Sequence, residues 1–491
     1  MKPVENGNEA YKKIVLFLKR RSRGVTIADL CAGTALPLSL ARELLPKAAD
    51  EYRGALEVTG SGEILYSFPH GFTSRYHGPG AIFKRFSSRL IEYLGITGAF
   101  LFKIWIMVML VGYFVLFLAI AIGSLFLSMA AQSNSKGNNR RGSVRFTASP
   151  FSMLWRLWFY SELTRPYKTH VNQKPPKKNR RAMHKAIFSF VFGEPDPNKN
   201  WKEREHKAVI AYIQGNRGTI SLGEYMAFSG KNSADAEEDL LSFCVLFHGS
   251  PEVTAEGTIV YYFDELMLRA DKQKFAELSP PVQRLKQFSG NPKTMNVWFI
   301  IINAVNLIFG SYFIYHSLAT GLLVLEEQFQ SASYLYAYTQ LLLYQITANP
   351  LPVITMGLGL IPLLFSILFW IIPALRHFLE ARENEKILTK NFKRLGFSRI
   401  WANPLNFGTD RLDFKIAECR PKNTDAAGDR VIKEMGAHST PEVTISPEGK
   451  TLFSFVELER EKKALQQYRQ EIDSSRWQLG ETVFDSRQAL P

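Results

Sequence analysis

The chain has 491 residues, a formal net charge of +15 and three cysteines. This length accommodates roughly two to four domains, and a hydrophobic content of 46% suits both globular and membrane-embedded parts. The cysteines, Cys31, Cys244 and Cys419, stand far apart with no metal-binding or redox spacing. Isolated thiols exclude a disulfide framework and a sequence-local zinc site, and they suit a reducing compartment.

Residues 1–75 predict a first folded unit. Helices are expected over 8–23, 26–30 and 39–49, with Thr26 as a cap, and two short strands around a turn follow them. A helix, a short helix, a third helix and a two-stranded hairpin form the order of a winged helix. We therefore expect 1–75 to be winged-helix-like unit 1.

The hairpin of this unit recurs three times. Each copy starts with Glu-Val-Thr and ends in alternating aromatics, and its Gly supplies the positive φ of the turn. From the Gly to the last Phe the spacing is 6 residues in every copy (62 to 68, 257 to 263, 449 to 455). The defining residues are Glu57, Gly62, Tyr66 and Phe68; Glu252, Gly257, Tyr261 and Phe263; and Glu442, Gly449, Phe453 and Phe455.

Such repeats fix the architecture. The sequence predicts a mostly α-helical protein with small β-wings, in which three winged-helix-like units alternate with transmembrane helices. Unit 2 is expected at 201–270, and a degenerate unit 3 at 377–456. A charged C-terminal helix and tail are expected at 457–491.

The first membrane segment is predicted at 96–131, and it is basic on both sides. Its uncharged core is 28 residues long (104–131), or about 42 Å as a helix, which is long for one span and short for two. A shallow helical hairpin bending near Gly112 or Gly123 is favoured, because it keeps all three units in the cytoplasm. A single tilted span, which would put unit 1 outside, is the alternative.

The basic excess is concentrated after this segment. Residues 132–192 hold 13 Lys and Arg against one acid, Glu162, a net +12. We interpret 132–200 as a basic linker whose amphipathic stretch, Phe151–Tyr160, lies at a membrane surface with anionic lipid headgroups. A solvated linker that obeys the positive-inside rule is the other reading.

Two further transmembrane helices are predicted, at 295–325 and 351–376. The Tyr-rich loop between them, 326–350, has no Lys or Arg, whereas both outer flanks are basic. The positive-inside rule places this loop outside and the folded units mainly in the cytoplasm of an inner (cytoplasmic) membrane. Three polar residues lie inside the second apolar stretch, Asn303, Asn306 and His316, and we expect hydrogen bonds between helices there.

The third helix of unit 2 carries four acids, Asp235, Glu237, Glu238 and Asp239. A DNA-binding winged helix places this helix in the major groove, where Lys and Arg contact phosphates. Residues 201–270 hold 6 basic against 11 acidic side chains, a net −5. The four acids are therefore candidate protein-binding residues, and nucleic acid is not the expected partner.

The chain resembles a family of uncharacterised bacterial membrane proteins with winged-helix-like repeats, over about half its length. The resemblance implies a membrane location and cytoplasmic repeats, and it implies no activity. It is carried by Phe192-Gly193-Glu194-Pro195-Asp196-Pro197 before Trp201, by Arg217-Gly218, and by Pro251-Glu252-Val253-Thr254 with Gly257, Tyr261 and Phe263.

No phosphate-binding loop, metalloprotease, hydrolase or kinase motif is present in the sequence. We expect no catalytic residue, cofactor or metal. The predicted function is a non-enzymatic membrane protein whose cytoplasmic units act as a scaffold or adaptor for a protein partner, which includes a second copy of the chain. The alternatives are a membrane-tethered nucleic-acid-binding regulator and a small transporter or channel component.

Overall fold

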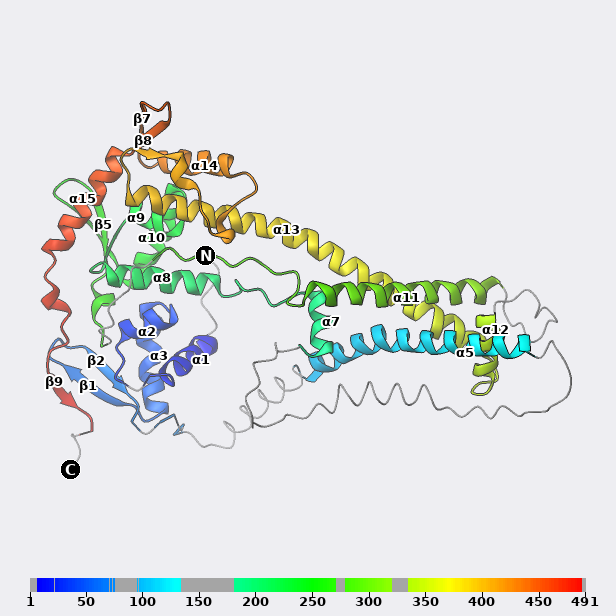
Figure 1. The fold of residues 1–491 in the computed structure, drawn as a ribbon. Coiled ribbons are helices and arrows are strands. Elements are labelled where there is room, and N and C mark those ends of the chain that lie inside the picture. The colour runs from blue at the N-terminus through cyan, green and yellow to red at the C-terminus, as the bar shows by residue number, and fades with distance from the viewer. Residues whose placement is uncertain are drawn as a thin grey trace, which may run out of the picture. The chain divides into compact units, whose positions relative to one another are not determined.

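The computed structural model describes residues 7–21, 23–69, 71–72, 74–75, 95, 97–133, 181–270, 279–319 and 334–487 (Figure 1). These residues are mostly helical, with small three-stranded sheets, which confirms the coarse fold class. They fall into two compact units. The modular unit comprises Met1–Ser88, Asp196–Lys286 and Ala381–Pro491, and the bundle unit comprises Arg89–Pro195 and Gln287–Glu380.

Module 1 opens the modular unit. It contains α1 (Gly7–Leu18), α2 (Ile27–Thr34), α3 (Leu38–Glu51) and a hairpin of β1 (Ala55–Thr59) and β2 (Ile64–Ser67). Thr26 caps α2 as predicted, because its hydroxyl accepts from the Asp29 amide and the Asp29 carboxylate accepts from the Thr26 amide.

Module 2 follows the same order. It contains α8 (Trp201–Gly215), β3 (Thr219–Ser221), α9 (Leu222–Ser229), α10 (Ser233–Phe247), β4 (Ser250–Val253) and β5 (Ile259–Tyr262), and a 3-10 turn, η2 (Glu265–Met267), ends it.

Module 3 has a remodelled first half. It uses the distal part of α13 (Ile361–Ala402), followed by β6 (Phe407–Gly408), the 3-10 turns η5 (Thr409–Leu412) and η6 (Ala417–Cys419), α14 (Thr424–Gly436), β7 (Glu442–Ile445) and β8 (Thr451–Ser454). Two 3-10 turns stand where modules 1 and 2 have their second α-helix.

The sheets share one connectivity. In module 2 the order is β3-β5-β4, and in module 3 it is β6-β8-β7, so a strand placed before the last helix pairs with the second hairpin strand. In module 1 a single bridge from Val25 to Tyr66 takes that place.

The three hairpin turns are equivalent, but the third Glu-Val-Thr is not. Gly62, Gly257 and Gly449 all have positive φ and donate to the residue three before them. Glu57 and Glu252 pair with Leu65 and Val260, three residues before the last Phe. Glu442 instead pairs with Ser454, one residue before it. Glu442 therefore lies two positions farther from the turn than Glu57 and Glu252, although the three turns have the same length.

A single hydrophobic core joins the three modules. It contains Ile14 and Leu45 from module 1, Phe247 from module 2, and Phe397 and Phe455 from module 3, all fully or nearly fully buried. Contiguous burial of this kind makes the modules one cooperative body rather than separate domains.

Arg394 of α13 fixes module 3 to module 2. Only 6% of this residue is exposed, and its guanidinium donates to Ser229 O at 2.8 Å, to Pro281 O at 2.7 Å and to the Glu205 carboxylate. Burial lowers the pKa of the Arg394 guanidinium, and the Glu205 charge opposes that shift. The carbonyl and carboxylate acceptors thus compensate a buried charge.

Two asparagines of α13 hold an extended segment along the helix. The Asn391 amide accepts from Gln283 N and donates to Gln283 O, at 2.9 and 2.8 Å. Asn384 makes the same pair with Lys286, at 2.8 and 2.9 Å. Seven residues of helix rise about 10.5 Å, and three residues of extended chain rise about 10 Å, so both amides meet backbone groups in register.

A C-terminal belt crosses the modules (the red segment in Figure 1). It consists of α15 (Val456–Glu471), a 3-10 turn η7 (Ser474–Trp477) and β9 (Thr482–Asp485). Arg469 donates to the nearly buried Glu224 of module 2 at 2.6 Å. Strand β9 then pairs with β1 of module 1 to give the sheet order β2-β1-β9. The charged helix was predicted, whereas β9 was not.

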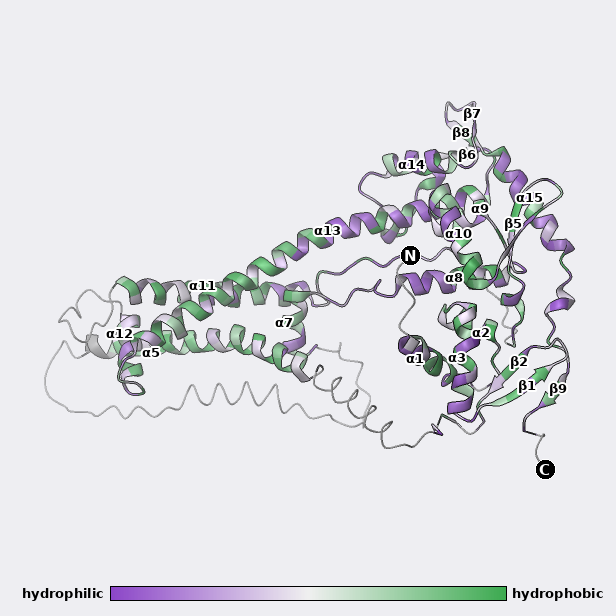
Figure 2. Cartoon of the chain, turned by 180° about the vertical axis from the view of Figure 1, so that it is seen from behind, coloured by the Kyte–Doolittle hydropathy of each residue, from purple (hydrophilic) through white to green (hydrophobic). Residues whose placement is uncertain are grey.

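The bundle unit contains the apolar helices. A π-helical turn, η1 (Val108–Gly112), leads into α5 (Tyr113–Ser133), and the other elements are α7 (Met183–Phe192), α11 (Lys293–Ala319), α12 (Tyr334–Tyr344), a π-helical segment η4 (Val353–Leu360) and the proximal part of α13. Among the described residues, three helices are long and apolar enough to cross a membrane: Thr97–Met129, Lys293–Ala319 and Val353–Ala402. Figure 2 shows the bundle helices largely apolar and α15 largely hydrophilic.

Two sequence interpretations of this unit are wrong. Residues 97–133 form one continuous helical run, so the hairpin near Gly112 or Gly123 does not occur. Gly112 lies in the π turn, where the helix continues. The segment 326–350, which was expected to be a loop, contains α12, and its Tyr336 is fully buried in a cluster with Phe117 and Phe313. The stretch Phe151–Tyr160, which was predicted to lie at a membrane surface, is outside the described residues.

Helices α11 and η4 cross at two glycines. A Cβ on Gly310 would lie 3.0 Å from Leu363 N, and one on Gly359 would lie 2.8 Å from Ile314 Cγ1. Gly357, only two residues away, has nothing closer to its Cβ position than Val353 Cγ1 at 3.8 Å. Gly359 and Gly310 therefore permit the close helix contact.

Arg394→Met should loosen the modular unit. Removing the guanidinium leaves Glu205 and two carbonyls without a donor, and we expect a loss of about 3 kcal/mol. Unfolding of the purified full chain in urea, followed by tryptophan fluorescence and trypsin resistance, measures this loss. Lys393→Met is the matched control. Its partner Glu434 and Lys393 itself are partly exposed, so the expected loss is below about 1 kcal/mol. Equal effects of the two variants would contradict the assigned role of Arg394.

Gly359→Ala should weaken the bundle, whereas Gly357→Ala should not. The extra methyl at 359 pushes against Ile314, and overpacking of this kind costs about 1–3 kcal/mol. Thermal aggregation of the detergent-solubilised chain is the measurement. Equal melting of the two variants would argue against a close contact at Gly359.

Candidate functional site

Helix α10 presents a solvent-facing stripe of acids and apolar residues. Its opposite face is buried through Ala236, Leu240, Phe243, Cys244 and Phe247. The outward positions hold Glu237, Glu238, Leu241 and Val245, and the last two are 49% and 75% exposed. We call these four residues the α10 stripe.

The four predicted acids of α10 have different surroundings. Asp235 lies in the first turn, where its amide donates to the capping Asn232 at 2.8 Å and its negative charge suits the helix N-terminus. Asp239 forms an ion pair with Lys231 and accepts from the Tyr225 hydroxyl at 3.3 Å. Glu237 and Glu238 face solvent. The structure thus brings only these two acids together with exposed apolar side chains.

In α3, the corresponding helix of module 1, the basic side chains are paired with acids. Arg42 pairs with Glu265 of module 2 at 2.9 Å, and Lys47 pairs with Glu43 at 2.6 Å. Helix α3 also contacts α10. A phosphate backbone would have to compete with these carboxylates for the two bases.

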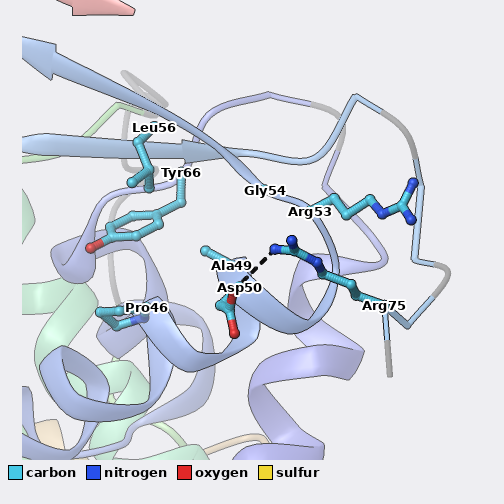
Figure 3. Close-up of a pocket in the computed structure, with 8 residues that line it drawn as sticks. All are labelled: Pro46, Ala49, Asp50, Arg53, Gly54, Leu56, Tyr66 and Arg75. Carbon is cyan, nitrogen blue, oxygen red and sulfur yellow. Dashed lines mark ion pairs between the residues drawn. The ribbon is translucent and has the colours of Figure 1, made fainter. Parts of the chain in front are cut away.

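A pocket of about 560 Å³ lies in module 1 between α3, β1 and β2. Figure 3 shows Arg75 reaching toward Asp50, at 3.7 Å, while the Arg53 side chain extends away from Asp50. Its other lining residues include Pro46, Leu56 and Tyr66. The charged groups do not converge on one point, so the pocket lacks the grouped polar atoms that orient a small ligand.

The residues that define the hairpin repeat are structural. Tyr66, Tyr261, Phe263 and Phe455 are buried, whereas Phe68 and Phe453 are partly buried. Gly62, Gly257 and Gly449 make the turns. The amides of Phe263 and Phe455 also donate to Gly218 O at 2.8 Å and Pro404 O at 2.9 Å. These aromatics anchor each hairpin to its module and are not available to a partner.

The buried face of α11 is unusually polar. It consists of Phe299, Asn303, Asn306, Gly310, Phe313 and Ser317, spaced alternately by four and three residues. That spacing keeps one face of the helix in the bundle.

Asn303 and Asn306 form the predicted hydrogen bonds between helices. Asn303 donates to Ser366 O on α13 at 2.9 Å, and Asn306 donates to Leu110 O in the first π turn at 2.7 Å. Tyr113 donates to Gly357 O in the second π segment at 2.9 Å. Both π-turn carbonyls lie where the regular helical ladder is interrupted, so side chains from neighbouring helices satisfy them.

His316 belongs to a separate aromatic cluster. Its ring lies 4.4 Å from the Tyr312 ring and 5.5 Å from the Tyr336 ring of α12. It is ten residues beyond Asn306, or about 15 Å along the helix. The structure does not group the three polar residues into one site.

The first part of the Phe192–Pro197 motif, up to Pro195, contributes to a polar junction in the bundle unit. Glu194 pairs with Arg181 and accepts from Ser189 Oγ at 2.6 Å and Gly290 N at 3.0 Å. The Arg181 guanidinium in particular holds the pKa of Glu194 at about 2. Arg376 of α13 donates to Phe190 O and Phe288 O, at 2.7 and 2.6 Å, and so joins α13 to α7 and to the segment that precedes α11.

Sequence reasoning missed Leu241 and Val245. The signal was present, because two apolar residues four apart fall outside the face defined by Leu240, Phe243 and Phe247. Within the described part of the chain, no group of three or more His, Cys, Asp or Glu is arranged to hold a metal ion.

Comparison with known proteins gives one relative. The chain is 24% identical, over 424 residues, to a chloroplastic protein of Arabidopsis thaliana that is described as uncharacterized; the match covers 78% of this chain and 71% of the relative. No family model matches the sequence, and no solved structure matches it. The resemblance to a bacterial family is therefore wrong, since the similarity leads to a plant protein.

Proposed function

We propose that the protein is a non-enzymatic membrane-anchored adaptor, in which three winged-helix-like modules form one body that binds a protein partner through the α10 stripe. The observation that carries the proposal is this stripe. Two free-standing acids and two exposed apolar residues occupy the helix that a DNA-binding winged helix would make basic.

The winged-helix assignment rests on connectivity. Each module has a last helix followed by a hairpin, and in each the second hairpin strand pairs with an earlier segment: Val25, β3 or β6. A shared order of pairing supports a shared fold, including for module 3, whose second helix is replaced by 3-10 turns.

A protein partner fits the surface better than nucleic acid. Exposed apolar side chains ringed by charge are typical of protein-binding sites. In module 1, the two basic residues that suit phosphate already pair with acids. The bundle also supports anchoring rather than transport, because Asn303 and Asn306 are committed to helix carbonyls.

We further propose that all three modules lie on one side of the membrane. They share a core. Within the bundle unit, residues near the start of the first long helix, α7, the start of α11 and the proximal part of α13 meet in one cluster, which supports the proposal. The connection from Ser133 back to α7 lies outside the described residues. The chloroplastic description of the relative supports a chloroplast-type membrane.

A photo-crosslinking amino acid at Val245 tests the partner. In native membranes we expect a discrete adduct with another protein, which Glu237→Lys with Glu238→Lys should reduce at least about tenfold, equivalent to about 1.4 kcal/mol of binding. The matched control is the crosslinker at Leu16, an exposed apolar residue on α1 (57% exposed), where the adduct should be absent. An adduct that is missing at Val245, or unchanged by the charge reversal, counts against the proposal.

Single-cysteine labelling tests the sidedness. The natural cysteines are buried, so Ser39→Cys, Glu256→Cys and Lys450→Cys report one exposed site in each module. We expect an impermeant maleimide to label all three from the same side, and to label Ile346→Cys, at the opposite end of the bundle, from the other. Labelling of Ser39→Cys together with Ile346→Cys would overturn the arrangement.

A further inference from the structure

In hairpin 1 (β1–β2), hairpin 2 (β4–β5) and hairpin 3 (β7–β8), the first strand has an outer edge, and the three edges differ in what covers them. Leu56, Pro251 and Val443 occupy one register, opposite Tyr66, Tyr261 and Phe453. Val58, Val253 and Ile445 occupy the next outward position, one residue before the turn. An uncovered edge exposes unpaired backbone N–H and C=O groups. Proteins either block such an edge against pairing with other strands or pair it with a specific strand.

In hairpin 1 the chain's own strand β9 covers the edge. The Leu56 amide donates to Ser486 Oγ at 2.8 Å, and Leu56 O accepts from Ser486 N at 2.9 Å. Phe484 lies opposite Val58, and Arg487 pairs with Glu57 at 2.6 Å. This hairpin shows that the outer edge of the repeat accepts an antiparallel strand.

In hairpin 2 the edge is blocked. Pro251 stands where Leu56 donates its outward N–H, and proline has no such donor. The neighbouring Glu252 carboxylate accepts from the Tyr468 hydroxyl of the belt helix α15.

In hairpin 3 the edge of β7 is neither covered by another strand in the described part of the chain nor blocked by a proline. All four residues of β7 are exposed, with Val443 at 59% and Ile445 at 77%. Among the described residues no strand pairs with its outer side, and Figure 1 shows the hairpin projecting from the rest of the modular unit. By register with Leu56 and Val58, the N–H and C=O groups of Val443 and Ile445 face outward.

The strand is complementary to itself. Antiparallel pairing of two β7 strands about a twofold axis at Thr444 places Val443 of each copy opposite Ile445 of the other, and both pairs exchange two hydrogen bonds. Thr444 then faces Thr444 of the second copy, and paired β-branched residues and paired threonines are favourable in sheets. The one charge, Glu442, falls opposite Ser446 of the second copy, so like charges do not meet.

We propose that β7 pairs in this way with β7 of a second copy of the chain, so that the protein forms twofold dimers through hairpin 3. A four-residue strand pair buries less surface than a stable interface in solution requires, roughly 1,200 Å². The contact therefore forms between copies already concentrated in one membrane. It does not depend on the α10 stripe and is tested separately from it.

Disulfide trapping in native membranes tests the contact. In a non-hydrogen-bonded antiparallel pair the two Cα atoms lie about 4.5 Å apart, which is within disulfide range. Full-length Thr444→Cys should therefore give a disulfide-linked dimer after mild oxidation. The matched control is Glu252→Cys, which holds the same register in hairpin 2 and should give none.

A second substitution distinguishes a disulfide formed within a strand pair from one formed by random collision of two copies. Val443→Pro in the Thr444→Cys chain copies Pro251 of hairpin 2, where proline is tolerated, and should abolish the dimer. Val443→Ala keeps the N–H and should retain it. Trypsin resistance of the modular unit shows that each variant is folded. The proposal is overturned if folded, maleimide-accessible Thr444→Cys stays monomeric, if Glu252→Cys dimerises equally, or if Val443→Pro leaves the dimer unchanged.

Discussion

One hydrophobic core unites three segments of chain that are separated by helices long and apolar enough to cross a membrane. This constraint governs the rest of the structure. Because a core excludes water continuously, its three contributing segments must meet, and the helices between them must return the chain to that core. The buried guanidinium of Arg394, the asparagine pairs and the C-terminal belt all stabilise contacts between modules rather than within them. The adaptor proposal depends on this rigidity, since a single body presents α10 in a fixed orientation.

Local chemistry made part of the fold predictable. The three turns were recognised because a glycine with positive φ and flanking alternation are signals within ten residues. The cap at Thr26 and the charged helix before residue 472 followed for the same reason. The acids of α10 were predicted to bind a partner, but only Glu237 and Glu238 face solvent beside exposed apolar side chains, because Asp235 lies at the helix start and Asp239 pairs with Lys231.

Non-local pairing explains what was missed. Strand β9 joins β1 across more than 400 residues of sequence, and its few residues carry no periodic signal of their own. The third Glu-Val-Thr was aligned with the other two by residue type alone. Its hydrogen-bonded register differs from theirs by two positions, an even number, so its side chains stay on the same faces of the sheet. The first apolar stretch was predicted to form a helical hairpin because it is longer than one membrane span requires. The structure instead continues it as a helix whose π turn has a carbonyl satisfied by Asn306.

The match between α13 and the extended segment at Asn384 and Asn391 restricts how this protein can evolve. Insertion of one residue between the two asparagines would rotate one side-chain amide by about 100° and leave a backbone N–H and C=O of the extended segment without partners. Insertion of one residue into the extended segment alone would shift its register along the helix by about 3.3 Å. Insertions and deletions should therefore be excluded from both stretches in any descendant that keeps the fold.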